Sequence, residues 1–147
     1  MKMFTNSSLI KRKNILFLCT GNSCRSLIAE AITNELGNGS IISESAGSRP
    51  TGFAHPKAIA VLEQHGIETN GLDSKPWDNF ANRTFDYVIT VCDSAASEHC
   101  PVHMNASERL HWSIPDPAKF EGTEDEQMKI FNKTFFMLKE KIVNNLL

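Results

Sequence analysis

Two periodicities of apolar and polar residues run along this chain, and together they predict alternating strands and helices. Strands are predicted at 14–18, 41–46, 85–91 and, less clearly, 110–112, and the continuous apolar run Ile15–Leu18 is typical of a strand covered on both faces of a parallel sheet. Apolar residues spaced as on one helix face occur at 25–36, at 56–65 and from 123 to near the end, with a shorter helix at 77–80. Short links between strands and helices favour parallel strands with right-handed crossovers. We therefore expect a flexible lead-in at 1–13 and one α/β domain at 14–147, a three-layer α/β/α fold with a four-stranded parallel sheet.

The turn between the first strand and the first helix, CTGNSCRS at 19–26, carries the most specific chemistry. A strand that feeds a glycine-containing loop into a helix N-terminus gathers free backbone N–H groups and the positive end of the helix dipole at one point. Arg25 opens the predicted helix and adds a planar guanidinium that suits a tetrahedral oxyanion. The expected oxyanion site consists of Thr20, Gly21, Asn22, Ser23, Cys24, Arg25 and Ser26.

Cys19 begins this turn and is the candidate nucleophile. The helix N-terminus and Arg25 favour a thiolate, and the Ser26 hydroxyl is placed to donate a hydrogen bond to it, so we expect a lowered pKa for Cys19. A nucleophile and an oxyanion receptor in one loop are the groups needed to attack a phosphate-like centre. A nucleotide-binding loop would end in Gly-Lys-Ser or Gly-Lys-Thr, which is absent here. A buried structural cysteine at a strand end is the simpler alternative.

Composition narrows the class of protein. The 147 residues, 41% of them hydrophobic, suit one compact domain with a single core. A net charge of −2 argues against a nucleic-acid binder, and no apolar run approaches the ~20 residues needed to cross a membrane. The N-terminal residues lack a signal-peptide hydrophobic segment, so we expect a cytoplasmic protein. Four cysteines are too few for a disulfide scaffold and, in a reducing compartment, indicate redox or catalytic groups.

Two of these cysteines, Cys92 and Cys100, follow the third predicted strand. If residues 93–99 are helical, their Cα atoms lie about 12 Å apart at ~1.5 Å per residue, whereas a disulfide needs them within roughly 7 Å. A bond between them therefore requires the segment to unwind, which its serine content makes easy. Alternatively, both are buried small side chains, or they form a zinc site with His99 and His103. That spacing fits no common zinc finger, and we predict no metal.

The loop CTGNSCRS resembles the phosphate-binding loop of the low-molecular-weight protein tyrosine phosphatase superfamily. Within that superfamily it is most similar to the cysteine-based arsenate reductases that share the phosphatase fold. The segments TVCDSAA, CPV and HWSIPDPA are similar to the same pattern, and the resemblance covers roughly residues 14–146. It implies a relay in which Cys19 forms an adduct, Cys92 displaces it through a Cys19–Cys92 disulfide, and Cys100 attacks Cys92. The final disulfide would lie on a surface loop within reach of an external reductant.

The resemblance also implies an activity. We expect reduction of arsenate to arsenite without a cofactor, with Asp116 as general acid and Arg25 and the loop amides binding the oxyanion. Expected partners are arsenate or phosphate and a reductant, either thioredoxin or a glutaredoxin with a small thiol, but neither nucleic acid nor a membrane. The alternative is a phosphatase of this superfamily that hydrolyses phosphate monoesters through a cysteinyl-phosphate intermediate. Such phosphatases usually carry aromatic residues after the Asp-Pro pair, where this chain has Ala118-Lys119-Phe120.

A departure from the family pattern concerns a cation. Relatives that reduce arsenate can bind a monovalent cation near the loop through residues that match Asn22, Glu30 and Ser45 and through an acidic residue later in the chain. At that later position this chain has Lys75, after Ser74. We therefore expect the ammonium of Lys75 to take the place of the cation.

Overall fold

The computed structural model describes residues 12–93 and 105–147, which form a four-stranded, all-parallel sheet in the order β2-β1-β3-β4. The strands are β1 (Lys13–Leu18), β2 (Ile41–Ala46), β3 (Thr84–Thr90) and β4 (Asn105–His111). The α-helices are α2 (Arg25–Gly37), α3 (Pro56–Gln64) and α5 (Glu124–Leu146), and the 3-10 helices are η1 (Trp77–Phe80) and η2 (Pro117–Lys119). The predicted parallel sheet is confirmed, whereas nearly all of the predicted flexible lead-in lies outside the described residues.

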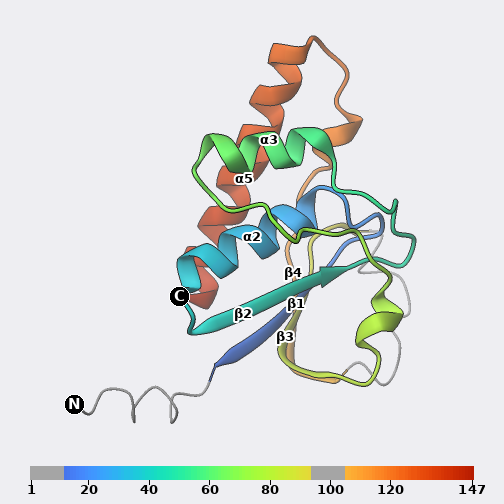
Figure 1. Cartoon of the computed structure of the whole chain (residues 1–147), viewed down its shortest axis with the longest axis vertical. Coiled ribbons are helices and arrows are strands. Elements are labelled where there is room, and N and C mark those ends of the chain that lie inside the picture. The colour runs from blue at the N-terminus through green and yellow to red at the C-terminus, as the bar shows by residue number, and fades with distance from the viewer. Residues whose placement is uncertain (1–11, 94–104) are drawn as a thin grey trace, which may run out of the picture.

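Strand β1 is central because both of its faces are covered. Its last four residues are completely buried, which explains the uninterrupted apolar run. Ile15 and Phe17 belong to a large core with α2, α3 and α5, whereas Leu16 and Leu18 belong to a smaller core with Phe80 of η1. Figure 1 shows the three α-helices together on one side of the sheet. The predicted α/β fold with a four-stranded parallel sheet is confirmed, and on the opposite face the described residues place the short 3-10 helix η1, through Phe80.

Strand β4 is longer than the sequence indicates. Residues 110–112 were the predicted strand, and the observed strand is Asn105–His111. Within the described residues β4 pairs only with β3, so it lies at the edge of the sheet. An edge strand keeps polar and charged residues, because one side of it faces solvent. The run ASER at 106–109 therefore lacks the apolar signal that marks β1 and β3.

The helix starts follow from local hydrogen bonding. As predicted, α5 begins after Thr123, whose hydroxyl accepts from Glu126 N (3.1 Å) while the Glu126 side chain accepts from Thr123 N (2.8 Å). Helix α3 begins after His55, whose Nδ1 accepts from Lys57 N at 3.0 Å, a cap that is uncommon for histidine. No helix in residues 12–93 or 105–147 is both long and apolar enough to cross a membrane.

The carboxyl ends of the parallel strands meet at one edge of the sheet. Cys19 follows β1 directly, Gly47 follows β2, and Cys92 lies two residues after β3. The chain leaving β4 runs to η2 along this edge. In an open α/β sheet, this is the edge at which ligands bind.

Candidate active site

The loop between β1 and α2 is held from outside by the segment 49–55. Three loop carbonyls accept backbone hydrogen bonds from this segment: Arg49 N to Thr20 O (2.9 Å), Thr51 N to Gly21 O (3.0 Å) and His55 N to Ser23 O (2.9 Å). In a trans peptide the N–H points opposite to the preceding C=O, and the described residues contain no cis peptide. The loop N–H groups that follow these carbonyls therefore point away from the segment, as an oxyanion receptor requires.

Asn22 fixes the loop from within. It is completely buried and has a φ of 47°, a left-handed conformation that asparagine tolerates better than most residues. Its amide nitrogen donates to Ser26 Oγ (2.8 Å) and Ser45 Oγ (3.0 Å), and its Oδ1 accepts from Lys75 N (2.8 Å). The observed partner of the Ser26 hydroxyl is therefore Asn22 rather than the predicted Cys19. Through these bonds one side chain ties the loop to α2, to β2 and to the chain before η1.

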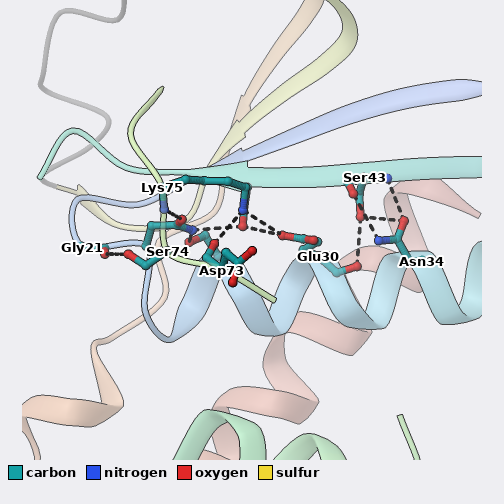
Figure 2. A network of polar contacts seen from close by, with 10 residues as sticks. Gly21, Glu30, Asn34, Ser43, Asp73, Ser74 and Lys75 are labelled. Atoms are coloured by element: carbon teal, nitrogen blue, oxygen red, sulfur yellow. Dashed lines mark hydrogen bonds and ion pairs between the residues drawn. The ribbon is translucent and has the colours of Figure 1, made fainter. Parts of the chain in front are cut away.

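Lys75 stands beside a buried carboxylate on α2, as Figure 2 shows. Its Nζ lies 3.9 Å from Glu30 Oε1 and donates to Asp73 O at 2.7 Å. Glu30 Oε1 also accepts from the Ser45 hydroxyl at 2.6 Å. Burial raises the pKa of Glu30, while the Ser45 hydrogen bond and the charge of Lys75 oppose that rise. The ammonium of Lys75 therefore lies next to Glu30, where the sequence predicts that it replaces a cation. The backbone N–H of the same residue holds Asn22 of the loop.

Cys19 and Cys92 are in hydrogen-bonding contact through their sulfur atoms, although they follow different strands. Both thiols are buried, with 4% and 3% of their surfaces exposed. Cys92 Sγ also accepts a hydrogen bond from Thr20 N at 3.4 Å and lies 3.7 Å from Thr20 Oγ1. Thr20, which follows the candidate nucleophile Cys19 in the chain, is therefore also in contact with the second thiol, Cys92.

The predicted lowering of the Cys19 pKa is wrong in this arrangement. The hydrogen bond with Cys92 and burial raise the pKa of Cys19, and they outweigh Arg25 and the Asn22 N–H, which lower it. The loop does supply the stabilising groups that its sequence indicates. The relay predicted from the sequence brings Cys92 to Cys19, but the predicted pKa of Cys19 left out the effects of the Cys92 thiol and of burial.

Arg25 joins the phosphate loop to the segment that carries the candidate acid. Its Nη1 donates to Ile114 O at 2.8 Å, and its Nη2 lies 3.5 Å from Asp116 Oδ2. Asp116 Oδ1 accepts from Ala118 N at 2.9 Å, which caps η2 and orients the carboxylate. Among the described residues, Arg25 Nε is one of two buried side-chain atoms without a hydrogen-bond partner. An oxyanion beside the guanidinium would satisfy that donor.

A cleft of about 550 Å³ brings these groups together. Its walls come from three parts of the chain: the loop residues Thr20, Gly21 and Arg25, then Cys92 and Asp93, and then residues 113–116 with Lys119. The cleft therefore holds a guanidinium, an ammonium, two carboxylates and a thiol, with the Cys19 thiol in contact with Cys92. A tetrahedral oxyanion fits within this volume.

Five of the predicted site residues, Thr20, Gly21, Arg25, Cys92 and Asp116, line this cleft, and some of the others lie outside the described residues. Cys19, the loop, Arg25, Cys92 and Asp116 are brought together as expected. Cys100, the zinc candidates His99 and His103, and nearly all of the predicted helix at 93–99 lie outside the described residues. Across residues 12–93 and 105–147, no group of three His, Cys, Asp or Glu side chains is close enough to hold a metal ion.

Sequence reasoning missed two features of the site. The segment 49–55 supports the loop through backbone donors, which leave no residue-type signature in the sequence. Asp93 lines the cleft, and the ring of His111 holds its carboxylate through a hydrogen bond. The position of Asp93 directly after Cys92 was the sequence feature that could have identified it as a site residue.

Comparisons with known proteins identify the family of this chain. Residues 14–147 match the family model described as low molecular weight phosphotyrosine protein phosphatase. Similar proteins include an arsenate reductase of Halalkalibacterium halodurans, 36% identical over 124 residues that cover 84% of this chain and 88% of the relative. A glutaredoxin arsenate reductase of Synechocystis sp. is 32% identical over 133 residues, covering 90% of this chain and 95% of the relative. A solved arsenate reductase in a phosphate-binding state has a TM-score of 0.74 and 31% identity, covering 90% of this chain and 95% of that one. The chain therefore belongs to the low molecular weight phosphotyrosine protein phosphatase family.

Proposed function

We propose that this protein reduces arsenate to arsenite through a relay of three thiols, Cys19, Cys92 and Cys100. The observation that carries the proposal is the contact between Cys92 and Cys19 beside the guanidinium of Arg25. Hydrolysis of a phosphate ester needs one nucleophilic thiol, whereas a disulfide-forming step needs a second thiol against the first. The names of the similar proteins, which are arsenate reductases, support the same reaction.

The first step forms the adduct. The Cys19 thiolate attacks arsenic, a sulfur–arsenic bond forms, and one arsenate oxygen leaves as water after taking a proton from Asp116. Arg25 and the inward-facing loop amides hold the remaining oxygens and stabilise their charge. Because the pKa of Cys19 is raised by Cys92 and burial, loss of its proton is an early requirement of this step.

The second and third steps move two electrons. The Cys92 thiolate attacks the Cys19 sulfur, a disulfide forms, and the sulfur–arsenic electron pair stays on arsenic, which leaves as arsenite. The Thr20 N–H, 3.4 Å from Cys92 Sγ, is placed to stabilise that thiolate. Cys100 then attacks Cys92, which frees Cys19 and leaves a Cys92–Cys100 disulfide. An external dithiol returns two electrons to that disulfide and completes the cycle.

Two reductants suit the last step. A thioredoxin attacks an exposed protein disulfide directly, whereas a glutaredoxin works with a small thiol such as glutathione. One relative is named a glutaredoxin arsenate reductase, so the glutaredoxin system has to be tested beside thioredoxin. Arsenate turnover with each reductant system in turn, at matched concentrations, identifies the one that this chain accepts.

The proposal is tested by comparing two activities on one preparation. Cys92→Ser and Cys100→Ser are expected to stop multiple turnover of arsenate and to keep p-nitrophenyl phosphate hydrolysis within about three-fold, because hydrolysis needs no resolving thiol. Cys19→Ser is expected to abolish both activities, and Cys24→Ser, the matched loop thiol, to keep both measurable. Wild-type arsenate turnover in Cys92→Ser and Cys100→Ser would refute the relay and favour the phosphatase alternative.

A further inference from the structure

A chain of hydrogen bonds ties the residue after Cys92 to the ends of two strands. His111 ends β4, and its Nδ1 lies 2.7 Å from Oγ1 of Thr90, the last residue of β3. The other ring nitrogen, Nε2, lies 2.9 Å from Asp93 Oδ1. Thr90 and His111 are register partners in the sheet, so their backbones fix the ring at its carboxyl edge. We refer to Thr90, His111 and Asp93 together as the His111 clasp.

The His111 clasp can be satisfied in both charge states of the imidazole. A carboxylate only accepts hydrogen bonds, so Nε2 carries the proton that it donates to Asp93. In the neutral ring, Nδ1 accepts from the Thr90 hydroxyl. In the imidazolium, Nδ1 donates to Thr90 Oγ1, and the hydroxyl proton turns toward Leu110 O, 3.5 Å away. The geometry of the His111 clasp is therefore the same in both forms of the ring.

Other groups act on the carboxylate of the clasp. The pKa of Asp93 is lowered first by its hydrogen bond with His111, then by Ser113, and further by the charges of His111 and Arg25. Asp93 therefore remains the anionic partner of His111 on the acidic side of neutrality.

Cys92 lies between two fixed points of the backbone. On its N-terminal side, Val91 N donates to Leu18 O at 2.9 Å, which joins the chain to the end of β1. On its C-terminal side, the clasp holds Asp93. The attacking sulfur of a thiol–disulfide displacement has to approach in line with the bond that it breaks, so small errors in the position of Cys92 reduce the rate.

We propose that His111 is a positioning residue for the thiol relay: by holding Asp93 it orients Cys92 toward Cys19. This inference rests on the proposed arsenate reduction. Asp93 has 79% of its side chain exposed, and exposed ion pairs contribute little to folding. The effect of the His111 clasp therefore falls on the disulfide step and not on the stability of the fold.

The test measures the Cys19–Cys92 disulfide in a single turnover. In a Cys100→Ser background the disulfide accumulates after arsenate is added, and quenched samples are mapped by mass spectrometry. His111→Ala is expected to slow disulfide formation about ten-fold, because the attacking sulfur is no longer aligned. His111→Gln, whose amide still donates to Asp93, is expected to be slowed less. Hydrolysis of p-nitrophenyl phosphate, which does not use the relay, is expected to stay within about two-fold.

A control histidine separates positioning from general damage to the protein. His65→Gln serves as control, because His65 stacks on Phe135 and bonds Asn132 outside the cleft. Disulfide rates that are equal in parent and His111→Ala, or a parallel loss of ester hydrolysis, overturn this inference alone. A parent protein that forms no disulfide with arsenate overturns the relay and this inference with it.

Discussion

The two thiols of the phosphate loop differ in their surroundings. Cys19 contacts Cys92, whereas the hydrogen-bonding neighbour of Cys24 Sγ is Ser23 Oγ at 3.7 Å. Burial raises the pKa of Cys24 to about 11, against the opposing effect of the Ser23 hydroxyl. Cys24 therefore remains a protonated thiol at neutral pH, which fits a supporting place in the loop.

The raised pKa of Cys24 makes the fold sensitive to alkali. An unfolded chain releases this proton near pH 9.0, whereas the folded protein holds it to about pH 11. Between these values the unfolded state binds fewer protons, so the free energy of unfolding falls as pH rises, by about 2 kcal/mol in total from this group. Cys24→Ser removes this contribution. Urea unfolding at pH 8 and pH 10.5 is expected to show a smaller loss in Cys24→Ser than in wild type, and equal losses would contradict the assignment.

Lys75 is expected to act as the built-in counter-charge of Glu30 behind the phosphate loop. Lys75→Met leaves the Glu30 carboxylate, which is 12% exposed, without its ammonium, while the backbone bond from residue 75 to Asn22 remains. We expect the KM for p-nitrophenyl phosphate to rise several-fold and potassium chloride to restore part of it, with choline chloride as the ionic-strength control. Lys57→Met removes a cation from an exposed pair with Glu124 and is expected to change neither quantity. An unchanged KM in Lys75→Met would show that the ammonium has no part in ordering the loop.

At the scale of elements, the phosphate loop depends on segments that do not touch the substrate. The segment 49–55 turns the loop amides inward, and the end of β2 packs directly against the loop backbone. A Cβ atom on Gly47 would lie 2.5 Å from the carbonyl oxygens of both Cys19 and Thr20. These are backbone atoms, so they cannot move aside without shifting the loop itself.

Gly47→Ala is therefore expected to damage oxyanion binding more than folding. We expect phosphate, measured as a competitive inhibitor of ester hydrolysis, to bind at least about ten-fold more weakly, because loop geometry sets the strength of such sites. Gly66→Ala is the matched control, because Gly66 has a φ of +72° and no atom within 4 Å of the added Cβ. That control is expected to lose about 1 kcal/mol of stability while binding phosphate normally. Equal phosphate affinity in both variants would argue against the tight contact at Gly47.

At the scale of the whole molecule, the sequence predicts the strands, helices and loop of the fold better than it predicts the contacts between distant side chains. The apolar run Ile15–Leu18 indicated a central strand because both faces of β1 are covered, and CTGNSCRS indicated the oxyanion loop because each residue type there has a chemical use. Strand β4 was misplaced because its edge position leaves polar residues in it. The raised pKa of Cys19 was missed because it depends on the depth of burial and on the hydrogen bond between the two thiols, which no local pattern encodes.

The cleft is assembled from three segments of the chain. The thiol relay is the central proposal for what this cleft does. One measurement tests it most directly: reduced protein receives one equivalent of arsenate without any reductant, and arsenite and disulfides are quantified after a single turnover. The account predicts one arsenite for each protein and a Cys92–Cys100 disulfide with Cys19 again free. A Cys19 adduct that persists without arsenite or a disulfide, or no arsenite while phosphate esters are hydrolysed, would contradict it.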